Sequence, residues 1–281
     1  MNPKYLSMLQ IVICAFLWST GGIFIKLIPW HAFVLSGTRS LFAALMVLIY
    51  IKIAKIKLEI NKQTLSIAGC LCLTFLAFVL ANKMTTAANA IILQYIAPVL
   101  ILIYLAVFKK KRFVARDYVV VACTVLGIFL FVMDGISAGN LLGNIVGIIG
   151  GITFAGVFIT SSGVSESTRF SGIFQGQLLT AIVGMPFMAV YETSFDMQSI
   201  ILVILLGLFQ LGLPYALYAV ALKTCPPLTA SLIAVLEPLL NPLWVFLATG
   251  ELPGTWSLVG GAIVLISVTV WCAKDAMVKK T

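Results

Sequence analysis

One carboxyl group lies where a charge is least stable. Glu237 occurs in the apolar run LIAVLEPLLNPLW at 232–244, between aliphatic residues and prolines. A charge at the centre of a bilayer costs about 3 kcal/mol, so such groups face a bundle interior or a wet cavity. We therefore expect Glu237 to bind substrate or to exchange a proton. A structural carboxylate that satisfies a neighbouring helix is the alternative.

Helical spacing places other small, polar and aromatic residues on the same face as this carboxyl. Residues at i, i+4, i+7, i+11 and i+14 share one side of a helix, and here they are Ala230, Ala234, Glu237, Asn241 and Trp244. Pro238 and Pro242 lack a backbone N–H, so they leave carbonyls of the preceding turn without a donor. The pattern predicts a polar nook beside Glu237.

Three further candidate residues lie in the apolar runs near the N-terminus. Trp18 is half-way along its run and is expected to line a cavity, with simple packing as the alternative. Lys26, two turns later, is expected to extend its ammonium toward the surface. Arg39 is too deep to act as an orientation charge, and we expect its guanidinium to contact helix carbonyls.

Neutral amides and hydroxyls complete the candidate site. They occur in three apolar runs, at 86–108, 170–191 and 198–220, and suit amphipathic or zwitterionic small molecules better than multiply charged ones. The predicted substrate-binding residues are Trp18, Asn89, Gln94, Tyr95, Gln210, Tyr218, Glu237, Asn241 and Trp244.

The composition indicates that the solvent of this chain is largely lipid. Of its 281 residues 62% are hydrophobic and 10% are charged, against roughly a quarter charged in soluble domains. Six cysteines are scattered through apolar runs and there is one histidine, so no zinc-binding set is expected. The sequence has no phosphate-binding loop and no catalytic motif, so we expect no cofactor, no metal and no use of ATP.

Ten apolar runs are long enough to be membrane-spanning helices, which need about twenty residues. They are 6–27, 31–51, 64–82, 86–108, 117–134, 140–161, 170–191, 198–220, 227–249 and 255–273. The first run is too long for a signal peptide and is expected to be a retained helix. The Gly143, Gly147 and Gly151 face of the sixth is expected to pack within the chain rather than to form a dimer.

Basic residues indicate the orientation. If the N-terminus is cytoplasmic, 15 of the 18 lysines and arginines fall on the cytoplasmic side. We therefore expect an inner-membrane protein with both termini in the cytoplasm. The net charge of +9 then reflects orientation and contact with anionic lipid, and no nucleic-acid partner is expected.

A shift of 140 residues reveals an internal repeat. Ala81, Lys83, Ala90, Pro98 and Leu100 match Ala221, Lys223, Ala230, Pro238 and Leu240. This predicts an all-α membrane protein of two five-helix repeats, 1–136 and 137–281. Because five is odd, the second repeat is inverted in the membrane, and the substrate site is expected at the midplane between the two.

The same residues carry a family resemblance over essentially the whole chain. The segments WSTGGIFIK at 18–26, Arg39, TTAANAIILQYIAPVL at 85–100, LEPLLNP at 236–242, ATGEL at 248–252 and Gly260–Gly261 resemble EamA-type permeases of the drug/metabolite transporter superfamily. The resemblance implies ten helices and export or exchange of amino acids, related metabolites or drugs, often with ion coupling.

These observations predict a secondary transporter that exports small amphipathic metabolites such as amino acids by alternating access. It is expected to be a monomer or homodimer and not an enzyme. Glu237 is the candidate for proton coupling, because an apolar environment favours the neutral acid. A membrane-embedded lipid-modifying enzyme is one alternative. A non-transporting scaffold or receptor is another, and it predicts a filled bundle centre.

Overall fold

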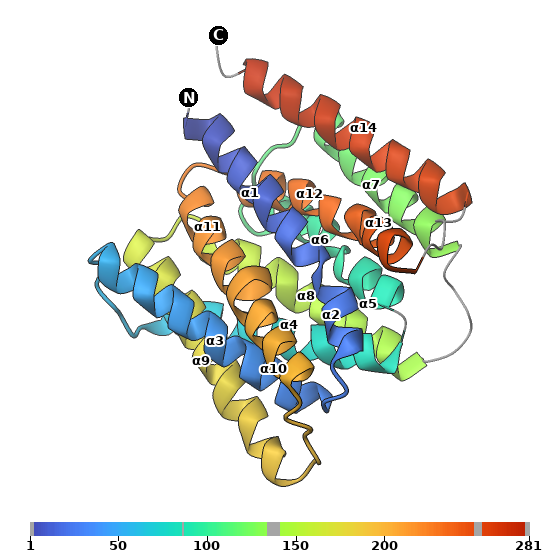
Figure 1. The fold of residues 1–281 in the computed structure, drawn as a ribbon. Coiled ribbons are helices and arrows are strands. Elements are labelled where there is room, and N and C mark those ends of the chain that lie inside the picture. Colours follow the sequence, from blue (N-terminus) through green and yellow to red (C-terminus); the bar gives the residue numbers. More distant parts are fainter. Residues whose placement is uncertain (1–2, 86, 134–140, 250–254, 279–281) are drawn as a thin grey trace.

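The first half of the chain forms seven helices. The computed structural model describes residues 3–85, 87–133, 141–249 and 255–278 (Figure 1). The helices of this half are α1 (Pro3–Ser19), α2 (Gly21–Leu27), α3 (Ala32–Ile53), α4 (Lys62–Met84), α5 (Ala87–Gln94), α6 (Ala97–Val107) and α7 (Ala115–Met133).

The second half contributes nine further helical elements, including a 3₁₀ helix, η1, and a π-helix, η2. They are α8 (Leu141–Ser161), α9 (Glu166–Gly184), η1 (Met185–Ala189), α10 (Met197–Leu205), η2 (Leu206–Gly212), α11 (Leu213–Ala221), α12 (Pro227–Ala234), α13 (Leu236–Thr249) and α14 (Thr255–Val278). Every regular element in the described part of the chain is helical.

Each of the ten predicted spans coincides with one helix or with a pair or trio of helices in series. Six are continuous, long and apolar enough to cross a bilayer: Pro3–Leu27, Ala32–Ile53, Lys62–Met84, Leu141–Ser161, Glu166–Ala189 and Met197–Ala221. Two others are interrupted, between α5 and α6 and between α12 and α13. The prediction of an all-helical membrane protein is confirmed.

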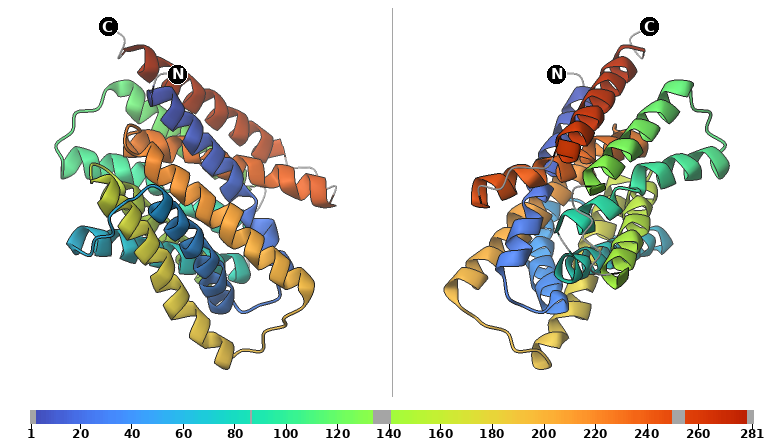
Figure 2. Two further views of the ribbon diagram at one scale, coloured as in Figure 1. Left: turned by 60° about the vertical axis from the view of Figure 1, so that its left-hand side comes forward. Right: turned by 90° about the vertical axis from the view of Figure 1, so that its right-hand side faces the viewer.

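The two halves enter the bundle in opposite directions. The start of α1 and the end of α14 lie at one end of the molecule (Figures 1 and 2). We call this the terminus face; there the Thr224 hydroxyl donates to the Pro3 carbonyl, and the Trp271 indole donates to Asp117. In contrast, α8 begins at the far face, where Gly143 packs on Met84 at the end of α4.

Helix contacts follow the pseudo-two-fold relation that such an inversion requires. α4 packs on α8 and α1 packs on α11, so the third segment of each half contacts the first segment of the other. The second segments meet as α3 and α9, and the fifth segments meet as α7 and α14. The halves therefore share one interior instead of forming two separate cores.

The interruptions also repeat. α5 spans Ala87–Gln94 and α12 spans Pro227–Ala234, so the two short helices occupy positions that differ by 140 residues. Each is followed by a proline, Pro98 or Pro238, within the first turns of the next helix. The missing N–H of a proline removes a hydrogen bond from the helix, which explains a break just before it.

Close packing at the centre depends on glycines. A Cβ on Gly37 of α3 would lie 2.6 Å from the backbone nitrogen of Met185, so the helix pair α3 and α9 approaches backbone to backbone. Gly147 packs against the side chain of Leu93 of α5, and Gly151 packs against its backbone carbonyl. The glycine face of α8 therefore packs within the chain, as predicted.

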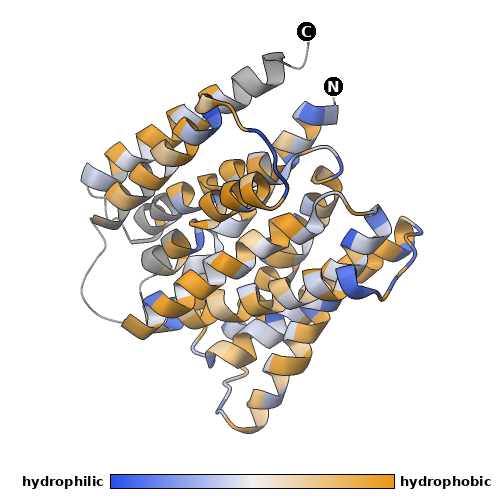
Figure 3. Cartoon of the chain, turned by 180° about the vertical axis from the view of Figure 1, so that it is seen from behind, coloured by the Kyte–Doolittle hydropathy of each residue, from blue (hydrophilic) through white to orange (hydrophobic). Residues whose placement is uncertain are grey.

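The outer surface fits a lipid solvent. Hydrophobic residues cover most of the outward helix faces, and hydrophilic residues gather mainly in loops and at helix ends (Figure 3). At one such end Asn61 caps α4: its side chain accepts from the backbone of Thr64, whose hydroxyl accepts from the Asn61 N–H. This capping box defines where the third span begins.

Substitution of Gly37 by alanine is expected to destabilise the bundle. The added methyl group must push α3 away from the backbone of α9, and such overpacking costs about 1–3 kcal/mol. Thermal unfolding of the purified protein in detergent should therefore begin several degrees lower. Gly69→Ala is the matched control, because a Cβ at Gly69 of α4 has nothing within 4 Å. Equal melting temperatures for the two variants would contradict the close approach of α3 and α9.

Candidate functional site

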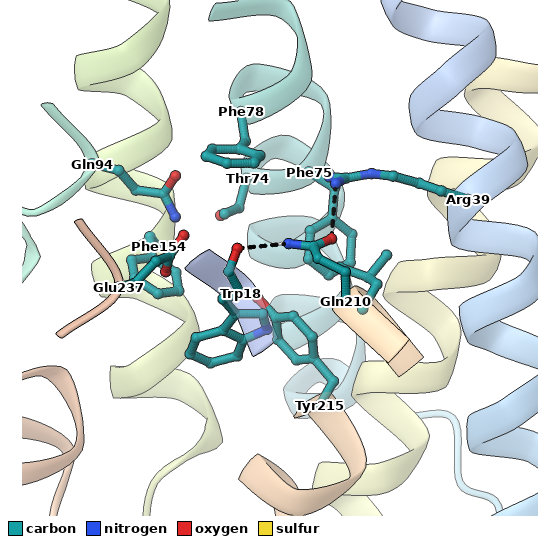
Figure 4. Close-up of a pocket in the computed structure, with 11 residues that line it drawn as sticks. Trp18, Arg39, Thr74, Phe75, Phe78, Gln94, Phe154, Gln210, Tyr215 and Glu237 are labelled. Carbon is teal, nitrogen blue, oxygen red and sulfur yellow. Dashed lines mark hydrogen bonds between the residues drawn. The ribbon is translucent and has the colours of Figure 1, made fainter. Parts of the chain in front are cut away.

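A small polar cavity lies at the centre of the bundle, between the two halves (Figure 4). Its volume is about 30 Å³, which is room for one or two water molecules. The lining side chains come from eight helical elements: Trp18, Arg39, Thr74, Phe75, Phe78, Gln94, Phe154, Gln210, Leu211, Tyr215 and Glu237.

The polar lining residues are concentrated at helix interruptions. Trp18 lies just before the break between α1 and α2, and Gln94 is the last residue of α5. Glu237 is the second residue of α13, and Gln210 lies in the π-helix η2. Irregular backbone at membrane depth is tolerated where it lines a polar cavity. The position of the cavity therefore accounts for the helix interruptions beside it.

The Glu237 carboxyl has one protein partner and one open side. The Tyr95 hydroxyl donates to its Oε2 at 2.5 Å. Its Oε1 has no hydrogen-bond partner among the described residues, and the Gln94 amide points toward it across the cavity (Figure 4). Tyr95 and Glu237 belong to the equivalent interruptions of the two repeats, so this bond joins the halves.

The Arg39 guanidinium stands on another side of the cavity. It is fully buried, and its Nη1 donates to Oε1 of Gln210 at 3.2 Å, while Phe78 packs 5.8 Å away. Gln210 in turn donates from Nε2 to the Trp18 carbonyl at 3.3 Å. The expected direct contact of Arg39 with helix carbonyls is wrong, because the Gln210 amide stands between them.

Arg39 and Glu237 carry opposite charges but do not form an ion pair with each other. The ion pairs within the described residues join Arg116 to Asp117 and Lys223 to Glu166. Arg39 Nε also lacks a hydrogen-bond partner in the described part of the chain. Buried charges are normally paired, so two unpaired charges beside one cavity define an electrically polar space.

Aromatic side chains cover the cavity toward the terminus face. The Trp18 ring packs against Tyr215 and Tyr218 at centroid distances of 5.2 and 6.1 Å. Phe158 packs against Tyr218 at 5.4 Å, and both lie one turn nearer the terminus face than the lining residues Phe154 and Tyr215. This layer separates the cavity from that face.

The structure brings together part of the predicted site. Trp18, Gln94, Gln210 and Glu237 line the cavity. Tyr95 is connected to the cavity by its hydrogen bond to Glu237, and Tyr218 by the packing of its ring against Trp18.

Trp244 lies elsewhere, and two predicted residues cannot be placed. The Trp244 indole donates to Ser19 Oγ at 2.7 Å and borders a separate outer pocket with Thr20 and Phe24. Trp244 belongs to the same helix as Glu237, α13, but lies seven residues, or about 10 Å, further along it. The side chains of Asn89 and Asn241 lie outside the described residues.

Several lining residues were not predicted as part of the site. Thr74, Phe75, Phe78, Phe154 and Leu211 occur in continuous apolar runs and resemble ordinary core residues in sequence. Tyr215 and Arg39 also lie outside the predicted set of substrate-binding residues. The depth of Arg39 in its span was the available signal, since a buried guanidinium requires a partner or a ligand.

Lys26 is exposed near the end of α2. Its ammonium donates to the Thr85 carbonyl at 2.9 Å at the far face, beside Lys83, which donates to the Ile28 carbonyl at 2.5 Å. Each lysine thus holds the end of the other's helix. Among the described residues, no three His, Cys, Asp or Glu side chains cluster as metal ligands would.

Comparison with known proteins agrees with this architecture. The EamA-like transporter family matches residues 5–133 and 141–271, once for each half of the chain. An uncharacterized transporter from Archaeoglobus fulgidus is 24% identical over 264 residues, covering 92% of this chain and 94% of its own.

A known crystal structure shares the fold. It covers 95% of this chain and 97% of its own, with a TM-score of 0.79 at 16% sequence identity. The double family match identifies the chain as a multi-pass membrane protein of a transporter family. This protein belongs to the EamA-like transporter family.

Proposed function

We propose that this protein exports small zwitterionic metabolites, such as amino acids, by alternating access between two repeats that meet near residue 136. The proposal places it in the inner membrane with both termini in the cytoplasm. The observation that carries it is the presence of Arg39 and Glu237, both buried and not paired with each other, beside one central cavity.

The two charges are complementary to a zwitterion. A substrate carboxylate would accept from Arg39, whose planar guanidinium suits bidentate contact. A substrate ammonium would donate to Glu237 and to the carbonyl oxygen of Gln94. The apolar part of the substrate would pack on Trp18 and Tyr215, whose rings flank the cavity. Binding would thereby neutralise both buried charges at once.

The central cavity is smaller than the proposed substrate. About 30 Å³ holds water but not an amino acid, so the site must expand to take up substrate. The interruptions at α5–α6 and α12–α13 would be the places where half-helices move. Pro98, Pro238 and Pro242 lack a backbone N–H and so remove helix hydrogen bonds there, and Pro214 has the same property in α11. On the far face, the contacts of Lys26 and Lys83 hold the ends of α2 and α4 together.

Proton coupling would act through Glu237. A neutral carboxyl crosses between conformations of the empty protein at a lower electrostatic cost than a carboxylate. An ionised carboxyl binds a cationic substrate group more strongly. Proton uptake and substrate binding would therefore alternate at the same side chain, and this exchange would couple the two fluxes.

A non-transporting scaffold is the second candidate, favoured by the small cavity volume. It accounts less well for the two unpaired charges, because a permanently closed bundle gains stability when apolar residues replace buried charges. Transport measurements separate the two candidates directly.

Glu237→Gln is expected to abolish or uncouple transport while leaving membrane insertion unchanged. The amide keeps the shape of the carboxyl but cannot ionise. The assay measures uptake of labelled amino acids by proteoliposomes with and without a proton gradient, across about pH 5.5 to 8. Glu166→Gln is the matched control, because Glu166 makes an exposed ion pair with Lys223 at the terminus face.

Wild-type uptake and pH dependence in the Glu237→Gln variant would eliminate the coupling role. The absence of amino-acid flux in the wild-type protein, together with unchanged metabolite pools inside and outside over-producing cells, would favour the scaffold.

Gly21→Ala is expected to lower transport through Gln210. A Cβ at Gly21 would lie 2.6 Å from Gln210 Nε2, so the amide must leave the Trp18 carbonyl and cease to support Arg39. Loss of about 1 kcal/mol of hydrogen bonding corresponds to a roughly fivefold lower kcat/KM. Gln210→Ala should have a similar effect, and the double variant should lose little more than either single variant. Additive losses would show that Gly21 acts independently of Gln210.

A further inference from the structure

A second polar pocket opens at the terminus face, away from the central cavity. It has a volume of about 200 Å³ and lies between the loop that precedes α7, the start of α12 and the last turns of α14. Three basic residues, Lys111, Arg112 and Arg116, contribute to its wall, and Asp117 supplies its carboxylate.

Among the described residues that line this pocket, one carboxylate stands against three basic side chains. Asp117 accepts from the Trp271 indole at 2.8 Å and from the Val114 backbone at 3.0 Å, and Arg116 Nε lies 3.9 Å from it. Lys111 and Arg112 have no carboxylate partner among the described residues. The pocket therefore presents uncompensated positive charge in a concave wall.

Uncharged hydrogen-bond donors in the pocket also favour binding of an anion. Thr229 is buried, lines the pocket, and makes no side-chain hydrogen bond to any described residue. It stands in the first turn of α12, whose N-cap is Pro226 and which has no side-chain cap. Helix N-termini favour anions because their first N–H groups lack partners inside the helix.

The loop that carries the cations is held in place. The Lys111 backbone donates to the Leu105 carbonyl at 3.0 Å, and the Lys111 ammonium lies 5.3 Å from the centre of the Phe113 ring. Phe113 itself packs against the hydrophobic core. This anchoring lets the basic residues form a wall instead of a mobile tail.

From this geometry we infer that the pocket binds the phosphate headgroup of an anionic phospholipid. The neighbouring surface distinguishes a lipid from a free anion. The outer faces of α7 and α14 continue from the pocket into the membrane and expose apolar side chains, among them Val119, Leu126, Ile266 and Val270. A lipid with its headgroup in the pocket can lay its acyl chains along these two helices.

Basic pockets between membrane helices bind anionic headgroups by this combination of charge and an adjacent apolar surface. Occupancy would tie the loop before α7 to α12 and α14. α12 is followed by α13, which carries Glu237. The lipid would therefore bind beside a half-helix that moves in the proposed transport cycle, and this consequence rests on the proposed function.

The test measures lipid binding by the full-length protein in detergent with native mass spectrometry. Short-chain phosphatidylglycerol and phosphatidylcholine are titrated separately, and inorganic phosphate is added as a competitor. Phosphatidylglycerol should bind more tightly, and phosphate at millimolar concentration should not displace it. In the double variant Lys111→Gln, Arg112→Gln the preference should fall by about 30-fold, because two positive side chains that face the headgroup are lost.

The double variant Lys109→Gln, Lys110→Gln is the matched control. It removes the same charge from the same loop, at residues that do not line the pocket. Thr229→Val provides an independent variant of nearly unchanged shape, in which affinity should fall by about 10-fold. Melting temperatures measured without lipid verify that each variant is folded.

Three results would overturn the inference. Equal losses in the two loop variants would show that only the total charge of the loop matters. Displacement by inorganic phosphate would show a site for a free anion. Equal affinity for the two lipids would show that the headgroup charge is not recognised.

Discussion

The organisation of this protein depends on the cost of placing charge in a membrane. Arg39 and Glu237 are both buried at the centre of the bundle. Neither can remain there without polar neighbours, because a charge in an apolar medium is strongly destabilised. Such neighbours are provided in part by Gln210 for Arg39 and by Tyr95 and Gln94 for Glu237. The hydrogen-bonding atoms of Arg39 and Glu237 that have no protein partner are available to a molecule in the cavity.

The helix interruptions follow from the same constraint. A regular helix uses all of its own backbone groups and offers only side chains to a ligand. Where α5 ends before α6 and α12 ends before α13, the backbone turns and brings Tyr95 and Glu237 into direct contact across the two repeats. The interruptions thus create the polar site and also provide points at which each half can bend.

Pseudo-symmetry shapes the scaffold but not the chemistry. Equivalent segments make equivalent contacts, as in the pairs α4–α8 and α1–α11. At the position of Glu237 in the second repeat, however, the first repeat has Ala97. The two halves therefore build a symmetric frame around a carboxyl group that has no symmetric counterpart. The electric field on a bound molecule would thus favour one orientation of its charged groups.

A comparison of the two halves of the sequence showed the repeat. The sequence by itself also determined the solvent of the chain, the ten spans and the position of Glu237 deep in one of them. These features depend on local quantities: apolar run length, proline positions and the cost of an isolated charge, each of which is read within about twenty residues. The interruptions at residues 95–96 and 235 could be predicted from Pro98 and Pro238 for the same reason.

Only the tertiary structure decided which side chains meet. The bond from Tyr95 to Glu237 joins residues 142 positions apart, and the contact of Arg39 with Gln210 spans 171. Phe154 and Phe75 became lining residues because their helices cross at the cavity, a relation that no local pattern contains. Trp244 contacts Ser19 instead of the cavity, because it lies seven residues beyond Glu237 in α13, about 10 Å further along the helix.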